Sequence, residues 1–215
     1  MRKLDRTKAP VPPCLAHYQH GRHRWGDLSP EDKEELRTCL EKIQGGLCAY
    51  CEGSLDLFGK HIEHLRPKGQ DPTQTFRWEN LYLSCNHEDS CGQHKDRKGR
   101  PFNVHELLAP CEDDPDQFLK FMPNGSIELQ PGLSEKDQHR ATETLRVFNL
   151  DPAFGRLRRL RERELATYLN GEPGIIDVLM TWRPEERRTF VEQELEKIST
   201  QPFSTIIRHF LRDAS

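Results

Sequence analysis

Four cysteines in two pairs constrain this chain more than any other feature of its sequence. Cys48 and Cys51 have two residues between them, and Cys85 and Cys91, with five residues between them, follow later in the chain. A tight turn lets the first two thiolates reach one tetrahedral Zn²⁺ at about 2.3 Å, and the second pair would close a four-thiolate structural site. Two other interpretations stay open at this point: small buried apolar residues, and a redox-active CxxC pair.

The number of cysteines and the first residues favour metal ligands over disulfides. The 215-residue chain has seven cysteines, an odd number, and Met1–Arg6 lacks the apolar segment of a secretory signal. The sequence also has no apolar run of about 18 residues, the length that a membrane-spanning helix needs. We therefore expect a cytoplasmic protein without membrane contact.

An adjacent acid and histidine lie between the two cysteine pairs, in the segment Lys60–Lys68. If this segment is a strand, His61 and Glu63 share one face and His64 lies on the other. A carboxylate binds a hard divalent cation well, and an imidazole can take a proton from water near neutral pH. A Glu-His pair by itself is more often a surface pair, but its place between the cysteine pairs favours a catalytic role for Glu63 and His64.

Three further residues complete the candidate site. Asn80 precedes a short apolar strand that leads into Cys85, where its amide could hold the loop after His64 or serve only as a turn residue. After Cys91 a short helix is expected, from which His94 could reach a metal on Glu63. Asp96 is the competing ligand, and a solvated His94 is the structural alternative.

The remaining patterns predict an α+β chain. Ser29-Pro30 begins a helix that Gly45-Gly46 can end, and Asn124-Gly125 favours a tight hairpin between apolar residues. Helical periodicity follows from Ser134. We divide the chain into an extended N-terminal segment (1–28), a zinc-containing unit with an N-terminal helix (29–109), a hairpin linker (110–132) and a helical C-terminal part (133–215).

The charge distribution is basic only locally. The formal net charge of −3 lacks the global basic signature of many nucleic-acid-binding proteins. Two clusters of cations could nevertheless contact phosphates. These are Lys95, Arg97, Lys98 and Arg100, and then Arg156, Arg158, Arg159, Arg161 and Arg163.

The ordered combination of these motifs resembles the HNH endonuclease family with its ββα-metal fold, over about 50 residues. Four segments resemble more narrowly the HNH proteins of retron and Septu anti-phage systems: Met1–Leu4, Cys48–Glu52, Ile62–Lys68 and Ser90–Gly92. Two positions depart from the commoner HNH pattern, because Glu63 stands where Asp is usual and Gly92 where His or Asn often stands. Because of the second departure, the distal metal ligand is the site residue that the resemblance defines least.

The resemblance implies hydrolysis of phosphodiester bonds in nucleic acid, with DNA expected before RNA. His64 would be the general base, Asn80 would orient it, and Glu63 with His94 would hold one Mg²⁺ or Mn²⁺. Arg66 or Lys95 would bind a neighbouring phosphate. The structural ion would be Zn²⁺. The resemblance also implies a separate ATPase as partner. The chain itself has no phosphate-binding loop of the GxxxxGK[ST] type.

Two other protein classes use some of the same residue types. A zinc deaminase is excluded by motif order, because the tight CxxC precedes the His-x-Glu and Ser84 rather than proline precedes Cys85. A non-catalytic zinc-knuckle module that binds nucleic acid or protein needs the cysteines but not Glu63, His64 and Asn80. The apolar stripe from Phe203 to Leu211 and the basic run from Arg156 are candidate partner surfaces, with a core stripe and a solvated helix face as the structural alternatives.

Overall fold

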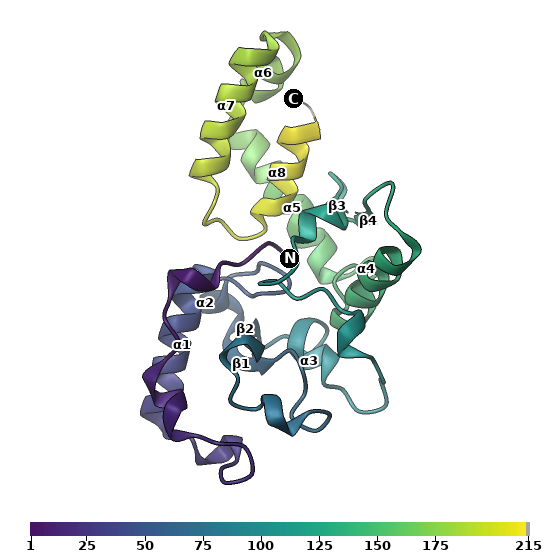
Figure 1. Ribbon diagram of the computed structural model, residues 1–215. Helices are drawn as coiled ribbons and strands as arrows, with labels where there is room; N and C mark the ends of the chain where they lie inside the picture. The colour runs from purple at the N-terminus through teal and green to yellow at the C-terminus, as the bar shows by residue number, and fades with distance from the viewer. Residues whose placement is uncertain (214–215) are drawn as a thin grey trace.

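The computed structural model describes residues 1–213 and shows a mixed α and β chain in two lobes (Figure 1). The helices are α1 (Pro30–Gln44), α2 (Leu55–Phe58), α3 (Cys91–Lys95), α4 (Glu135–Phe148), α5 (Arg156–Gly171), α6 (Ile175–Thr181), α7 (Pro184–Lys197) and α8 (Ser204–Asp213). The strands are β1 (Lys60–His64), β2 (Leu81–Cys85), β3 (Leu119–Phe121) and β4 (Ile127–Leu129). The α+β class predicted from the sequence is confirmed at this level.

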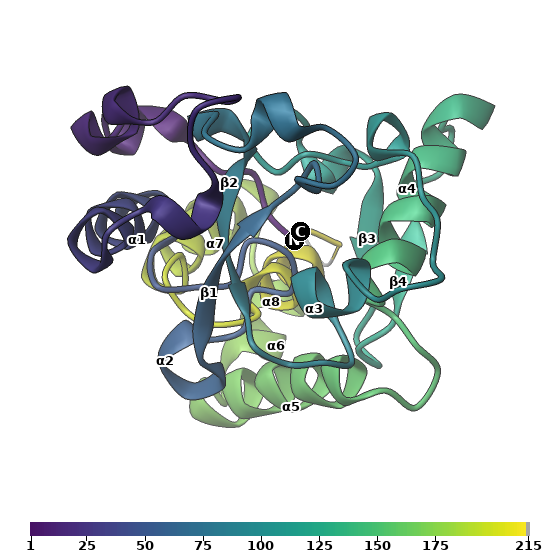
Figure 2. The same ribbon diagram turned by 90° about the horizontal axis from the view of Figure 1, so that it is seen from below.

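The β1/β2 hairpin lies at the centre of the larger lobe. The two strands are antiparallel, with Glu63 opposite Tyr82 and His64 opposite Leu81. Helix α1 packs against β2, as does α3, which in turn packs against α4 (Figure 2). The buried side-chain amide of Gln44, in the last turn of α1, donates to Leu83 O and accepts from Leu83 N, so it satisfies the free edge of β2. The unit formed by β1, β2 and α3 therefore has α1 on one side and α4 on the other.

Local sequence signals account for the ends of the elements. The Ser29 hydroxyl accepts from Asp32 N at the start of α1, and Gly45 ends α1 with a φ of 64°. At the second hairpin, β3 and β4 pair antiparallel around a turn in which Gly125 has a φ of 78°. Gly125 also lies so close to α5 that an added Cβ would lie 2.1 Å from Arg158 O. The predicted helix start and hairpin are confirmed.

The N-terminal segment 1–28 contains no α-helix or strand, and three short 3-10 turns divide it: Arg6–Lys8, Pro13–His17 and Trp25–Asp27. Six of its apolar side chains, from Met1 to Leu28, are buried in the core. The segment therefore wraps around α1 and the hairpin through packing as well as through extended backbone. Within residues 1–213, no helix combines the length and the apolar character that crossing a membrane requires.

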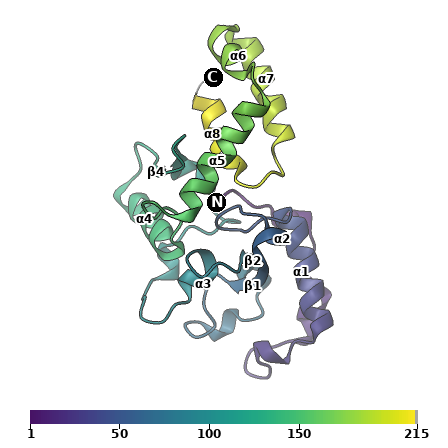
Figure 3. The ribbon, with the colours of Figure 1, turned by 180° about the vertical axis from the view of Figure 1, so that it is seen from behind.

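Helices α5 to α8 form the second lobe, which Figure 3 shows from behind. The apolar stripe that could have been a partner surface faces its interior: Ile206, Ile207 and Leu211 are fully buried, and α8 packs against α5, α7 and β3. The interpretation of this stripe as a docking surface is therefore wrong, because its side chains form the contact between α8 and the rest of the chain.

The basic run in α5 has a structural role at three of its five positions. Arg156 pairs with Asp89, and Arg158 and Arg161 both pair with Asp151. Arg161 is almost completely buried, and it donates to Gly125 O as well. The interpretation of the run as a continuous phosphate-binding stretch is corrected accordingly, because these three guanidinium groups tie α5 to neighbouring loops.

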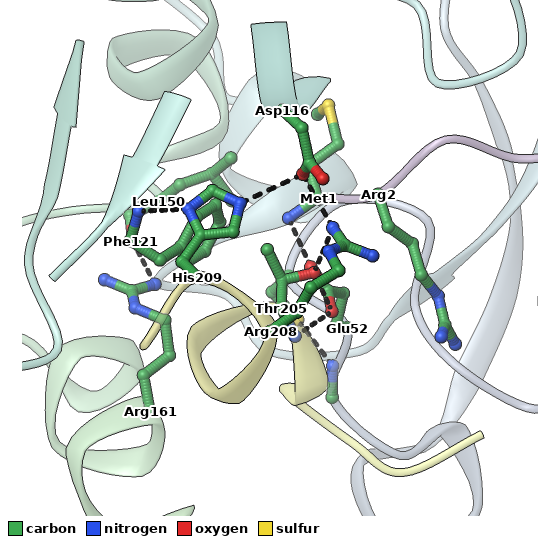
Figure 4. A network of polar contacts seen from close by, with 12 residues as sticks. Met1, Arg2, Glu52, Asp116, Phe121, Leu150, Arg161, Thr205, Arg208 and His209 are labelled. Atoms are coloured by element: carbon green, nitrogen blue, oxygen red, sulfur yellow. Dashed lines mark hydrogen bonds and ion pairs between the residues drawn. The ribbon is translucent and has the colours of Figure 1, made fainter. Parts of the chain in front are cut away.

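A buried carboxylate joins the two lobes at the cysteine turn. Glu52 follows Cys51, and its side chain accepts from the Met1 amino group at 2.8 Å and from the Thr205 hydroxyl at 2.7 Å (Figure 4). Its backbone carbonyl accepts from Phe203 N. The beginning of the chain, the cysteine turn and the start of α8 are thus held by one residue.

Candidate functional site

The four cysteines predicted as metal ligands converge at the base of the hairpin. The Sγ atoms of Cys48, Cys51, Cys85 and Cys91 lie within 4.8 Å of one another, and all four side chains are buried. The Sγ atoms of Cys51 and Cys85 are 3.9 Å apart. Four sulfurs at about 2.3 Å from a tetrahedral ion would be separated by roughly 3.8 Å, so the cluster has the dimensions of a zinc site.

The surroundings of the sulfurs suit thiolates. The N–H groups of Gly53 and Cys85 donate to Cys51 Sγ and Cys48 Sγ, each at 3.4 Å. Burial and the neighbouring thiols raise the pKa of Cys91 well above its ordinary value, because several negative sulfurs cannot lie together in a dry site without a cation. The chemistry of this donor set therefore fits Zn²⁺, and the cluster could bind it.

His64 ends β1, and its imidazole is held in one orientation. Its Nε2–H donates to Thr75 O at 3.0 Å, and Trp25 packs edge to face against the ring with 4.4 Å between centroids. Nδ1 lies 3.4 Å from the Lys68 ammonium. Burial and the nearby Lys68 charge lower the pKa of His64 to about 4, so the imidazole is neutral at pH 7.

Asn80 holds the segment that follows His64. Its Oδ1 accepts from Arg66 N at 2.7 Å, and its Nδ2 donates to Arg66 O at 3.0 Å and to Gln74 O at 3.1 Å. Asn80 is buried just before β2, so its amide ties the loop between the two strands to the hairpin. Through these bonds the Asn80 amide holds the loop that follows His64, which is the contact that the sequence predicted.

Glu63 and His61 share the face of β1 opposite His64, as strand alternation predicted. His61 Nε2 lies 3.4 Å from Glu63 Oε2, and the buried Lys95 ammonium lies 2.8 Å from Glu63 Oε1. Burial by itself would raise the pKa of Glu63, but His61 and Lys95 overcome it and lower the pKa. The carboxylate is therefore ionised, with one oxygen on Lys95 and the other beside His61.

Lys95 and Asp96 end α3 next to this carboxylate. The Lys95 ammonium lies between Glu63 and Asp96, 2.5 Å from Asp96 Oδ1, and its side chain is fully buried. Burial and the charge of Glu63 raise the pKa of Asp96. Lys95, predicted to bind a phosphate, thus sits as a buried counter-ion to Glu63.

His94, predicted as the distal metal ligand, points elsewhere in the structure. Its Nδ1–H donates to Val147 O at 2.9 Å, and its Nε2 contacts the Arg100 guanidinium. Within residues 1–213, no cluster of three metal-ligating groups contains Glu63. The structure therefore brings Glu63, His61 and Lys95 together and leaves His94 bound to α4 and Arg100.

Three hollows that contain cationic side chains lie along residues 66–75, in the segment that links β1 to β2. The first, about 660 Å³, is formed by residues 20–26 with Lys68, Pro72 and Thr75. None of these lining residues is acidic, and Arg22 and Arg24 are exposed. The other two hollows each include an acid: one of about 320 Å³ has Arg97 and Arg100 with Asp96, and one of about 420 Å³ has Arg66 with Asp71.

Sequence reasoning assigned no role to four neighbours of the predicted site residues: Trp25, Thr75, Lys68 and His61. Two carried a usable signal. Lys68 belongs to the same Arg66-Pro67-Lys68 motif, and His61 was already placed on the face of Glu63 by strand alternation. Trp25 and Thr75 carried none, because they reach His64 from segments distant in the sequence.

Comparison with known proteins gives three relatives, and no protein-family model matches the chain. A Septu protein PtuB from Bacillus mycoides (strain KBAB4) is 29% identical over 131 residues, which cover 49% of this chain and 44% of the relative. The protein named "Retron Vc95 putative HNH endonuclease" of Vibrio cholerae is 25% identical over 154 residues, 66% of this chain and 72% of the relative. A second Septu protein PtuB, from Bacillus thuringiensis, is 29% identical over 104 residues, 47% of this chain and 36% of the relative.

The matches span less than half the length of either Septu relative and nearly three quarters of the retron protein. The names of all three agree with the family inferred from the motifs. The comparisons therefore confirm the resemblance predicted from the sequence: the chain is similar to HNH-type nuclease proteins of Septu and retron defence systems.

Proposed function

We propose that this protein is a metal-dependent HNH endonuclease that hydrolyses phosphodiester bonds of nucleic acid, with DNA as the first substrate to test. We also propose that it is the effector of an anti-phage defence system and works beside an ATPase. The similarity to Septu and retron proteins supports the biological setting. The arrangement of the residues around His64 supports the chemistry.

The orientation of the His64 ring is the observation that carries the proposal. Because Nε2–H is bound to Thr75 O, the neutral imidazole has its lone pair on Nδ1, where it can accept a proton from water. Burial and then the charge of Lys68 beside Nδ1 lower the pKa of His64 in the free protein. A phosphate bound to Lys68 would offset that charge and make His64 a stronger base when substrate is present.

The chain's other residues would position this base and the phosphate. The Asn80 amide holds the backbone of Arg66 and Gln74, so the loop that carries Thr75 cannot shift freely relative to His64. Glu63 would hold the catalytic Mg²⁺ or Mn²⁺, and Lys95 keeps that carboxylate ionised. When bound, the cation supplies Lewis-acid stabilisation of charge on the phosphate and the leaving 3′ oxygen. We assign Zn²⁺ to the four cysteines as a structural ion.

The hollows with cationic side chains along residues 66–75 support a nucleic-acid substrate. Phosphates that flank the scissile bond could bind Arg22 and Arg24 in one hollow and Arg66 in another. Such contacts read the backbone rather than the bases. A protein-binding zinc knuckle has no need for cations arranged around a neutral, oriented histidine.

The decisive experiment measures cleavage of plasmid DNA with Mn²⁺ by the wild type and by His64→Ala, with chelated samples as blanks. His139→Ala is the matched control, because His139 is a largely exposed histidine on α4 that contacts Glu106. Cleavage by the wild type and His139→Ala but not by folded His64→Ala would support the proposal. Equal cleavage by all three would contradict the role of His64.

A second outcome would favour the non-catalytic alternative. The protein would act as a zinc-knuckle binding module if the wild type bound DNA or RNA but cleaved neither nucleic acid with Mn²⁺ or Mg²⁺, and if adding an ATPase encoded beside it restored no activity. Affinity purification of the full chain with that ATPase tests the proposed partner directly. Recovery of the wild-type chain without the ATPase would contradict the partnership.

A further inference from the structure

His61 lies on the same face of β1 as Glu63, at a distance that suits two ligands of one metal ion. The two residues are two positions apart on β1, and His61 Nε2 lies 3.4 Å from Glu63 Oε2. Donor atoms about 2.1 Å from one octahedral ion are separated by roughly 3.0 Å, so a small movement of either side chain would let both bind one cation. The imidazole and the carboxylate already point toward the same place.

Asn86 orients the His61 ring. The His61 Nδ1–H donates to Asn86 Oδ1 at 2.9 Å, so Nε2 is the ring nitrogen that faces Glu63, and it could bind a cation there after losing its proton. Asn86 follows β2, and Gly59 makes room for it, since a Cβ on Gly59 would lie 2.6 Å from the Asn86 amide. In metal-binding histidines, one ring nitrogen typically binds the metal while the N–H of the other donates a hydrogen bond that fixes the ring.

The Glu63 carboxylate divides its two oxygens between a counter-ion and this position. Oε1 is 2.8 Å from the Lys95 ammonium, and Oε2 lies beside His61. Lys95 keeps the buried carboxylate charged, because a buried ion without a counter-ion is strongly destabilised. Oε2 therefore remains available to a cation while Oε1 stays paired.

Helix α3 offers no metal-ligating side chain beside Glu63 Oε2. Gly92 of α3 packs against this oxygen, and a Cβ there would lie 2.5 Å from it. His94 has both ring nitrogens engaged, with Val147 O and Arg100. The Lys95 ammonium lies between Glu63 Oε1 and Asp96, so on the Oε2 side the second protein ligand comes from β1.

We propose that His61 Nε2 and Glu63 Oε2 together bind the catalytic divalent cation, and that His94 does not. This inference rests on the proposed nuclease function and names the ligand of the same site. Waters and phosphate oxygens would complete the coordination, as is usual for cations held by one or two protein groups. Because an imidazole suits later transition metals better than Mg²⁺, the site should bind Mn²⁺ more tightly than Mg²⁺.

Mn²⁺ binding to the full-length, zinc-loaded protein tests the ligand without reliance on activity. Titrations followed by the electron paramagnetic resonance signal of free Mn²⁺ would compare the wild type, His61→Ala, Glu63→Gln and His94→Ala. We expect the Kd to rise at least tenfold in His61→Ala, to rise further in Glu63→Gln and to stay within twofold of wild type in His94→Ala. Circular dichroism and zinc content control for folding.

A second variant keeps the test sharp if His61→Ala folds poorly. Asn86→Ala leaves both ligands in place but frees the His61 ring, and outer-shell changes of this kind weaken metal binding about 10- to 100-fold. Unchanged Mn²⁺ affinity in His61→Ala with lost affinity in Glu63→Gln would overturn this inference alone. A wild type that binds no Mn²⁺ would overturn the metal-dependent function as well.

Discussion

Replacing Glu52 with glutamine should destabilise the protein strongly although the shape of the side chain is kept. The variant removes the charge that faces the Met1 ammonium and leaves the backbone bond from Phe203 N to Glu52 O in place. It therefore isolates the carboxylate at the point where the cysteine turn meets the start of α8. The glutamine amide would also place its donors against either the Met1 ammonium or the Thr205 hydroxyl.

The size of the effect follows from the pKa of Glu52. Burial alone would raise this pKa, but the Met1 ammonium, Arg2 and Arg208 overcome it and lower the pKa from 4.5 to about 2. At about 1.4 kcal/mol per pKa unit, the ionised carboxylate stabilises the fold by roughly 3 kcal/mol. Because the folded-state pKa is lowered, this contribution is complete above pH 4.5 and is lost as the pH falls through 2. Breaking one partner of a buried pair costs a similar 3 to 5 kcal/mol or so.

Urea unfolding at pH 7 measures the loss. With an m-value of about 2 kcal/mol/M, a loss of roughly 3 kcal/mol moves the unfolding midpoint down by about 1.5 M. Glu162→Gln is the control, because Glu162 is exposed on α5. If Glu52→Gln unfolded within about 0.5 kcal/mol of the wild type, the carboxylate would not hold the two lobes together and the electrostatic reasoning would be refuted.

Four further outcomes are expected. Removing zinc with a strong chelator should unfold the hairpin unit, since metal binding and folding are coupled in small sites, and unchanged circular dichroism would contradict this. Asn80→Ala should lower stability by about 2 to 3 kcal/mol in thermal unfolding, since three hydrogen bonds are lost. With the pKa of His64 at about 4 in the free protein, kcat/KM for cleavage should rise with pH only below about 5 and stay flat to pH 8, and an inflexion of kcat/KM near 6.5 would contradict this. Arg22→Ala with Arg24→Ala should reduce the slope of log affinity for DNA against log salt by about 2, and an unchanged slope would remove residues 20–26 from the interface.

Short-range patterns in the sequence were sufficient for several features of the fold. The Ser29-Pro30 start of α1 and the Asn124-Gly125 turn between β3 and β4 need only local backbone preferences and a nearby hydrogen-bond acceptor. The alternation that placed His61 and Glu63 on one face of β1 follows from the geometry of any strand. The cysteine spacing predicted the cluster because a shared tetrahedral ion restricts where four thiolates can lie.

Charged residues were harder to interpret, because their roles depend on partners far away in the chain. Lys95 and Arg161 both lie in basic stretches, yet each is buried against an acid brought by another element: Glu63 for Lys95 and Asp151 for Arg161. A run of cations has the same sequence pattern whether it faces solvent or a buried carboxylate. The apolar stripe of α8 was ambiguous for the same reason, since amphipathic periodicity identifies a face but not what covers it.

The motif order therefore predicted the groups that this protein brings together: four cysteine thiols that converge on one place, and a carboxylate beside an imidazole on a strand. Tertiary packing decided which side chains complete the site. It turned His94 toward Val147, brought His61 against Glu63, and placed Thr75 behind the ring of His64. The physical reason is that a hydrogen bond fixes a side chain only when both partners are in place, and these partners meet only once the chain has folded.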